Sequence, residues 1–328
     1  MGLAEVSADS VRVAARSSAS ESGAPAGRPG STPPGARRRR LREAALSAGM
    51  LAPAVVIYTV MTIVPVVVAL YLSLTDWNGF SSAAFVGLEN YARLFDDPDT
   101  VRAGAVTVIV ALFGSVGMLG LGLVYALQLK ERNWANSFFR TLAYYPHVIS
   151  SLILGFLWSA ILGTNGAINN TLADLGIGPV GFLFDENLAV ITLVGVIVWA
   201  GFGFNVVLFV AGLQTVPREL VEAAQIDGAS RRQINRRIVI PMIAPVVTVA
   251  MVLNLVGLIK VYDIVVSLTD GGPAGSTETI AYVILTRSFA GTDVGFATAQ
   301  AVGLMVASAA LSVVVTALRN RQDRAATS

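Results

Sequence analysis

The stretch EAAQIDGASRRQINRRIVIPMIAP, Glu222–Pro245, is the most informative part of this chain. It begins as a polar segment with several arginines and passes into a long apolar run, and another long apolar run precedes it. Pro217 suits the first position of a helix, and Gly228 suits a left-handed turn that ends one. Ser230 and Gln233 have the spacing of a capping box. The sequence therefore predicts a helix, a glycine turn and a second helix, a shape that fits a cleft on a partner.

The chain as a whole is far more apolar than a soluble protein. Of its 328 residues, 54% are hydrophobic and 13% are charged, and the mean hydropathy is +0.67; soluble domains have about 25% charged residues. Roughly 20 apolar residues are needed to cross a bilayer, and such a run must be helical because no water bonds its backbone. Six runs qualify: Met50–Leu74, Ala103–Leu129, Thr141–Leu162, Leu188–Leu213, Pro241–Leu268 and Val294–Leu318. We expect an all-α polytopic membrane protein with six transmembrane helices.

Several classes of chemistry are excluded or disfavoured. The chain has no cysteine, which excludes disulfides and thiolate metal sites. Its one histidine, His147, cannot form a His-rich metal cluster, and we interpret it as an interfacial histidine rather than a proton relay. The spans hold no paired carboxylates, Ser/His constellation or His-Glu-x-x-His motif, which disfavours an intramembrane enzyme. No phosphate-binding Gly-x-x-x-x-Gly-Lys-Ser/Thr motif occurs either.

The distribution of positive charge predicts the orientation. Of the 23 Lys and Arg residues, 19 lie before Met50, in the loops 130–140 and 214–240, or in the C-terminal tail. Cytoplasmic loops carry this excess, so both termini are expected to be cytoplasmic. Residues 1–45 are expected to be a disordered basic tail, 46–320 the six-helix domain with a polar loop at 215–240, and 321–328 a cytoplasmic tail. The run Arg37–Arg40 is interpreted as an anchor at anionic lipid rather than a nucleic-acid site.

The polar loop resembles the EAA loop of bacterial ABC-importer permeases. Glu222-Ala223-Ala224, Asp227-Gly228-Ala229 and Pro241 carry this resemblance. Most of the chain after residue 45 is also similar to the first permease subunit of carbohydrate ABC importers. The segments that carry this second resemblance include Phe85–Tyr91, Lys260–Asp263 and Asp270–Pro273.

The resemblance implies a multi-pass permease subunit in the bacterial cell membrane. A second permease subunit would complete the pathway, and an extracellular solute-binding protein would deliver a sugar or oligosaccharide to it. An ATP-binding-cassette ATPase dimer would bind ATP and magnesium, so neither a cofactor nor a catalytic residue is expected in this chain. The residues implied to couple it to the ATPase are Glu222, Ala223, Ala224, Asp227, Gly228, Ala229 and Pro241.

Polar residues within the spans are candidates for the substrate pathway. A charge inside a span is costly, so it normally faces protein or water. Lys260 and Asp263 have a spacing of three residues, which allows an ion pair on one helix face. Such a pair could lock the helix to the second permease or line the pathway, and both interpretations stay open. The candidate pathway residues are Asn205, Asn254, Gly257, Lys260 and Asp263.

Two other transport functions are alternatives. One is an ABC importer permease for a solute other than sugar. The other is an ion-coupled secondary transporter, which would need buried acids or histidines, and only Asp263 is well placed for that role.

Overall fold

A computed structural model describes residue 46 and residues 49–80, 82–131, 133–290 and 293–327. The regular structure of these residues is helical, apart from one isolated β-bridge between Thr75 and Phe85. Six helical segments are long and apolar enough to cross a membrane, which confirms the predicted fold class: Gly49–Leu72, Pro98–Gln128, Ser151–Asp174, Glu186–Leu213, Arg231–Ile259 and Val294–Ala317. The predicted tail at 1–45 lies outside the described residues.

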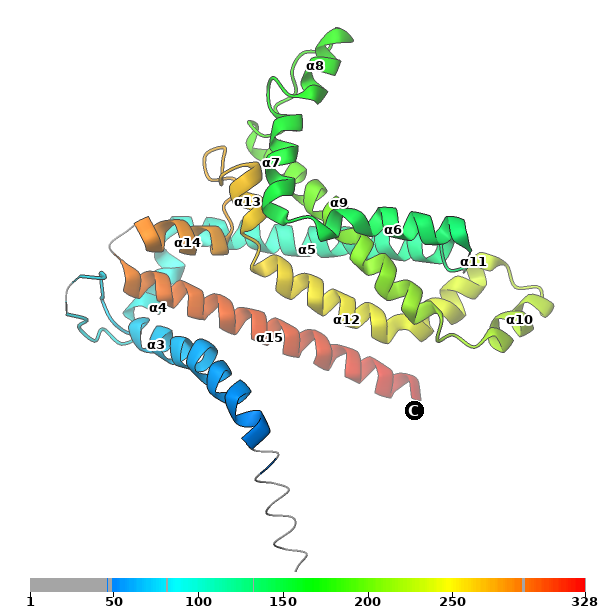
Figure 1. The fold of residues 1–328 in the computed structure, drawn as a ribbon, viewed down its shortest axis with the longest axis horizontal. Helices are drawn as coiled ribbons and strands as arrows, with labels where there is room; N and C mark the ends of the chain where they lie inside the picture. Colours follow the sequence, from blue (N-terminus) through cyan, green and yellow to red (C-terminus); the bar gives the residue numbers. More distant parts are fainter. Residues whose placement is uncertain (1–45, 47–48, 81, 132, 291–292, 328) are drawn as a thin grey trace, which may run out of the picture. The chain divides into compact units, whose positions relative to one another are not determined.

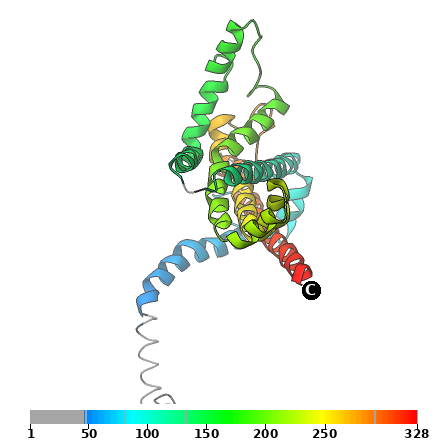
Figure 2. The ribbon, with the colours of Figure 1, turned by 90° about the vertical axis from the view of Figure 1, so that its right-hand side faces the viewer.

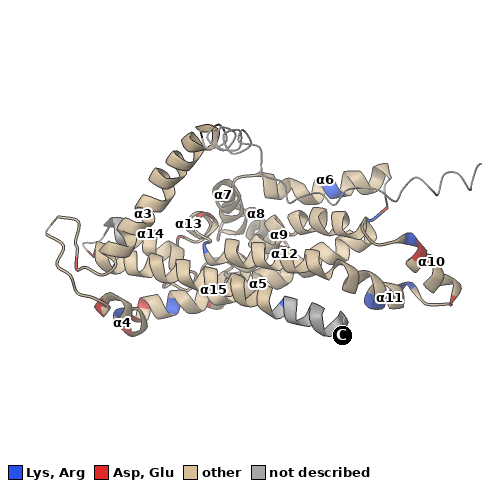
Figure 3. Ribbon diagram, turned by 90° about the horizontal axis from the view of Figure 1, so that it is seen from below, with Lys and Arg blue, Asp and Glu red and all other residues tan. Residues whose placement is uncertain are grey.

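The named elements follow the chain in order, and Figure 1 labels the α-helices among them. They are η1 (Thr59–Ile63), α3 (Val64–Leu72), α4 (Glu89–Asp96), α5 (Pro98–Gln128), α6 (Trp134–Val148), α7 (Ser151–Leu162), α8 (Ala167–Asp174), α9 (Glu186–Leu213), α10 (Arg218–Ile226), α11 (Arg231–Ile234), η2 (Asn235–Val239), α12 (Ile240–Ile259), α13 (Asp263–Leu268), α14 (Ile280–Ala290) and α15 (Val294–Thr327). Charged residues mark α4, α10 and α11 in Figure 3, whereas the long helices are mostly uncharged.

The described residues divide into two compact units, one that ends at Val64 and one that begins at Pro65. The described helix of the first unit is apolar all round, and Val55, Ile57 and Met61 are among its exposed side chains. In the first candidate span, Gly49–Leu72, the most apolar window has no buried residue. A helix of this composition is stable only where lipid or another chain covers it.

The core of the second unit lies between α5, α9 and α12, which run side by side in Figures 1 and 2. Small residues bring these helices together, since packing rather than hydrophobicity drives helix association in lipid. Gly122 of α5 is the clearest case, because a Cβ there would lie 2.6 Å from the Cβ of Asn205 on α9. The buried apolar residues around these contacts include Val110, Leu193, Ile197, Val206, Phe209 and Leu258.

The predicted third span, Thr141–Leu162, is not one continuous helix. α6 ends at Val148, Ile149 and Ser150 have extended ψ angles of 141° and 131°, and α7 begins at Ser151. Pro146 lies in the last turn of α6 and lacks the amide hydrogen that continues a helix. The candidate span starts only at Ser151 and includes α8. The prediction of an apolar run here was right, but the prediction of its continuity was wrong.

The predicted fifth span, Pro241–Leu268, is interrupted as well. α12 ends at Ile259, and α13 begins at Asp263 after a non-helical link. The backbone of this link stays hydrogen-bonded, because the buried Thr279 hydroxyl donates to the Val261 carbonyl at 2.8 Å. At its other end the span is longer than predicted, since α11, η2 and α12 form one helical run from Arg231 to Ile259.

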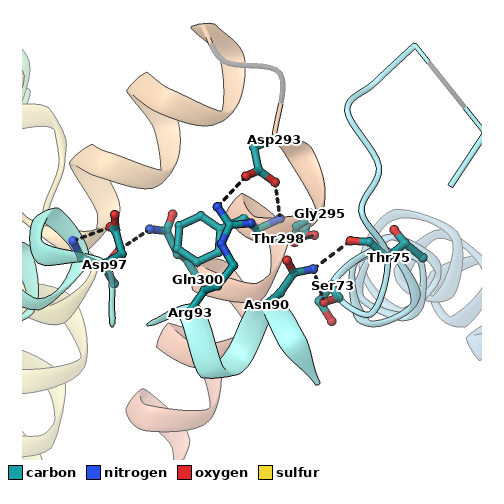
Figure 4. A network of polar contacts seen from close by, with 11 residues as sticks. Ser73, Thr75, Asn90, Arg93, Asp97, Asp293, Gly295, Thr298 and Gln300 are labelled. Carbon is teal, nitrogen blue, oxygen red and sulfur yellow. Dashed lines mark hydrogen bonds and ion pairs between the residues drawn. The ribbon is translucent and has the colours of Figure 1, made fainter. Parts of the chain in front are cut away.

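A polar network joins α4 to both of its neighbours (Figure 4). The buried Asn90 amide donates to the carbonyls of Ser73 and Thr75 at 3.0 and 2.8 Å. Arg93 forms an ion pair of 2.9 Å with Asp293, just before α15. These contacts hold the segment that follows α3 and the start of α15 against one short helix.

α15 is also fixed at two distant points along its length. Near its start, Gln300 Nε2 donates to Thr100 Oγ1 of α5 at 2.7 Å, and both side chains are buried. Near its end, Arg319 donates to the Ala244 carbonyl and, at 2.6 Å, to Thr248 Oγ1 of α12. The last helix thereby ties α5 and α12 together.

Candidate functional site

A cavity of about 430 Å³ lies beside the break between α6 and α7. Residues from α5, α6, α7, α9, α12 and α13 contribute to its wall, so both interrupted spans border it. Its apolar wall includes Met118, Leu154, Ile197, Leu253, Leu258 and Ile264. Its polar groups come from His147, Ser151 and Asn254, and Gly257 adds open space, since a Cβ there would meet nothing within 4 Å.

Two of the predicted pathway residues form a buried pair at this cavity. Asn254 Nδ2 donates to Asn205 Oδ1 at 3.0 Å, and Asn205 Nδ2 donates in turn to the Gly201 carbonyl at 3.3 Å. Asn205 is fully buried behind Asn254, which lines the cavity itself. The side-chain oxygen of Asn254, Oδ1, has no hydrogen-bond partner within the described part of the chain. That oxygen can accept a hydrogen bond from a molecule in the cavity.

The two charged candidates lie elsewhere. Lys260 and Asp263 are exposed and are not among the residues that line the cavity. Lys260 follows the last turn of α12, whereas Asp263 begins α13, and Tyr262 between them has a φ of −134°. The expected pairing along one helix face is therefore wrong, because no helix joins them, and the described residues show no ion pair between them.

Two aromatic residues of the cavity wall, His147 and Phe204, were not among the predicted pathway residues. The His147 ring lies 5.1 Å from the Phe204 ring at an interplanar angle of 27°, and both line the cavity. The histidine is therefore part of the cavity wall, and its predicted place at the membrane interface stays a prediction. Pro146, which precedes it, was the available signal, because a proline inside an apolar run predicts a kink or break.

The polar loop, residues 215–240, has the predicted helix–turn–helix form. α10 begins at Arg218, one residue later than expected, because Pro217 is its N-cap with a ψ of 130°. Gly228 has a φ of +77°. Its amide donates to the Gln225 carbonyl at 3.0 Å, and the Ala229 amide donates to the Ala224 carbonyl at 2.9 Å. These two bonds form a Schellman motif, which requires the left-handed residue that glycine supplies.

The capping box of the second helix is also confirmed. Gln233 Oε1 accepts from the Ser230 amide at 2.8 Å, and Ser230 Oγ accepts from the Gln233 amide at 3.4 Å. Pro241 lies apart from this turn, as the second residue of α12.

The tip of the loop is a mixed apolar and charged surface. Ile226 is 86% exposed, and Glu222, Ala223 and Asp227 beside it are exposed too. A hollow of about 260 Å³ adjoins the turn and is lined by Asp227, Gly228, Ala229, Gln233, Ile234, Arg237 and Ile238. The exposed Ile226 side chain thus lies among charged residues in the same loop as this hollow.

The Asn205–Asn254 pair generates a first prediction. Replacing either residue alone with leucine leaves a buried amide without its partner, which costs about 1–3 kcal/mol. We expect the double Asn205→Leu, Asn254→Leu variant to be destabilised by clearly less than the sum of the two single changes. Thermal unfolding of the purified protein in detergent measures all three effects. Additive losses would show that the amides do not interact.

Comparisons with known proteins agree with this geometry. The family model for the binding-protein-dependent transport system inner membrane component matches residues 118–328. The chain is 32% identical over 275 residues to the probable starch degradation products transport system permease protein AmyD of Thermoanaerobacterium thermosulfurigenes, covering 83% of this chain and 93% of that protein. It is 34% identical over 244 residues to the trehalose/maltose transport system permease protein MalF of Thermococcus litoralis, covering 74% and 82% respectively.

Solved structures show the same fold. A chain of a bacterial alginate ABC transporter, in complex with an alginate pentasaccharide-bound periplasmic protein, matches with a TM-score of 0.76 and 22% identity over 86% of this chain and 96% of that chain. A structure of a bacterial ABC transporter involved in the import of the acidic polysaccharide alginate gives the same TM-score. The family match covers more than half of this chain, and both curated relatives exceed 30% identity. The chain belongs to the family of inner membrane components of binding-protein-dependent transport systems.

Proposed function

We propose that this chain is one of two permease subunits of an ATP-binding-cassette importer for a sugar or oligosaccharide. The observation that carries the proposal is the helical run from Arg231 to Ile259. It starts at the capped turn of the polar loop and ends beside Asn254 and Gly257 in the cavity wall. At 1.5 Å per residue, its 29 residues span roughly 43 Å. One element thus joins a docking surface to the cavity.

The relatives support the cargo and the partners. Two of the relatives are named for starch degradation products and for trehalose/maltose, and the structural neighbour was solved with a periplasmic protein that holds a pentasaccharide. By analogy, an extracellular solute-binding protein delivers the sugar to this permease. A second permease subunit covers the rest of the pathway, and an ATPase dimer docks at the polar loop and binds ATP.

The cavity has the groups that a sugar requires. A sugar hydroxyl leaving water needs hydrogen-bond partners, which the Asn254 carbonyl and the Ser151 hydroxyl offer. The rings of His147 and Phe204 offer a flat surface for the apolar face of a sugar. Lys260 and Asp263 are exposed outside this cavity, and we place them on the partner-facing side of the pathway rather than at this subsite.

Uptake by the purified complex tests the function and the cavity together. The complex, reconstituted in proteoliposomes with its binding protein, should accumulate sugar only when its ATPase is active. Gly257→Leu should reduce the initial rate at least tenfold, because the side chain enters the cavity. Gly120→Leu is the matched control, since Gly120 also lies inside a span and a Cβ there meets nothing within 4 Å.

Equal uptake by the Gly257→Leu variant and the Gly120→Leu control would refute the placement of the pathway. Uptake driven by an ion gradient with an inactive ATPase would instead support the secondary-transporter alternative. A complex that moves an amino acid or a metal ion, and no sugar, would refute the proposed cargo.

The polar loop yields a prediction about coupling. In the Gly228→Val variant, the left-handed conformation costs about 1–2 kcal/mol. If the valine adopts another conformation instead, the tip of the polar loop points in a different direction. Gly228→Val should therefore reduce both co-purification of the ATPase and sugar uptake, while membrane insertion stays normal. Pull-down of the ATPase by the tagged permease measures this.

A second glycine in the same conformation provides the control. Gly176, after α8, has a φ of +76°, forms the same hydrogen-bond pattern and would meet nothing within 4 Å. Gly176→Val imposes a comparable local cost away from the polar loop, so the ATPase should remain bound. If both variants lose the ATPase equally, the loss reflects general misfolding and not the docking surface.

The orientation of the chain in the membrane is a further part of the proposal. The loop that holds α10 and the two termini are cytoplasmic, and the Gly176 turn is external, because Lys and Arg gather on the first side. The natural chain has no cysteine, so single-cysteine variants carry no background label of their own. In spheroplasts, an impermeant maleimide should label Leu175→Cys at once and Gln225→Cys only after permeabilisation. Labelling in the reverse order would show that the topology is the opposite of the one proposed.

A further inference from the structure

The cavity wall is uncharged. Among the described residues that line it, none is Asp, Glu, Lys or Arg. The hydrogen-bonding side chains are a serine, an asparagine and a histidine, and the His147 ring is stacked on Phe204. The nearest charged residues along the chain, Lys260 and Asp263, are exposed and outside the wall.

A wall without charged side chains suits neutral sugars and ionised sugars differently. A carboxylate or phosphate that leaves water needs a cation or several hydrogen-bond donors, and an unpaired buried ion costs several kcal/mol. Asn254 Oδ1 is an acceptor, which would repel an anion and bind a hydroxyl, and the hydrogen-bond donors of the wall belong to side chains without a fixed positive charge. A neutral saccharide needs only such hydroxyl partners and an apolar surface, and the leucine, isoleucine and aromatic side chains of the wall supply that surface.

The comparisons leave the charge of the cargo open. One structural neighbour serves the import of an acidic polysaccharide, whereas one relative carries the name of the neutral sugars trehalose and maltose. From the wall, and resting on the proposed function, we infer that this permease selects uncharged saccharides and rejects sugars that carry a carboxylate or a phosphate.

Transport of matched sugar pairs by the reconstituted complex tests the inference. The probes are malto-, cello- and galacto-oligosaccharides, each with its terminal uronic acid and its 6-phosphate. We expect at least one neutral probe to be taken up at least tenfold faster than both of its charged derivatives. If a charged derivative is taken up as fast as every neutral probe or faster, the inference is overturned, and the proposed function as a sugar importer still holds. If no probe in an enlarged panel is transported, the proposed function fails, and the inference fails with it.

A substitution in the wall separates the selectivity of the permease from that of the binding protein. Leu253 lines the cavity and is half exposed, so a longer side chain has room there. Leu253→Arg should raise the ratio of uronate to neutral uptake at least tenfold, because a carboxylate gains a cationic partner. Leu253→Met, uncharged and of similar size, should leave the ratio unchanged. The binding protein is the same in all assays, so its own selectivity cancels.

Two further variants protect the result against misfolding. Leu253→Lys places the same charge on a different side chain, and Leu253→Glu should move the ratio in the opposite direction. Complexes are compared only where ATPase co-purification and thermal stability match those of the parent. A ratio that stays the same for Arg, Lys and Glu shows that charge at this wall does not select the cargo, which overturns the inference.

Discussion

Backbone amides and carbonyls inside a bilayer have no water to bond, and the architecture of this permease follows from that constraint. Unbroken helices satisfy it along α5, α9 and α15. Where two spans do break, the freed groups find other partners. The Val261 carbonyl accepts from the Thr279 hydroxyl, and the Ile149 amide donates to the Pro146 carbonyl at 3.3 Å. The breaks are therefore built features with bonded backbones, and they border a cavity, the setting in which irregular backbone at membrane depth is tolerated.

The two breaks are neighbours in space and form one substructure. α13 packs against α7, and Gly155 of α7 faces the side chain of Ser267 on α13 so closely that no larger residue fits. Small-residue contacts of this kind hold helices at short distance in lipid. The cavity is consequently walled by two half-spans that pack on each other and by the unbroken α5 and α9. Short polar side chains such as Ser151 and Asn254 can line this cavity, and they bring no charge to the depth of the membrane.

Much of this could be predicted from the sequence, and the exceptions have physical causes. Composition and run length predict six spans because lipid imposes one rule on every segment, and Gly228 and Ser230 predict the loop because caps are local. Pro146 could have indicated the break after Val148, whereas the break after Ile259 escaped prediction because a hydropathy pattern carries no information on where a helix is interrupted. At the second break, the Val261 carbonyl is bonded by the hydroxyl of Thr279, which lies 18 residues further along the chain. Asn205 and Asn254 are 49 residues apart in the chain. The sequence therefore indicated each of them as a candidate but could not predict that they are hydrogen-bonded to each other.

The helical run from the loop to the cavity is not mechanically uniform. Its π-helical turn, η2, widens the backbone just before Pro241, and Pro245 lies within the following turns. Wide turns and prolines are where helices bend. Beyond them, Arg319 ties Ala244 and Thr248 to α15, and Gln300 ties α15 to α5. The run therefore has a turn at η2 where helices tend to bend and, beyond it, a section of α12 that is hydrogen-bonded to α15. Asn254 and Gly257 lie past the contacts with Arg319, so the cavity borders the part of the run beyond the point where α15 holds it.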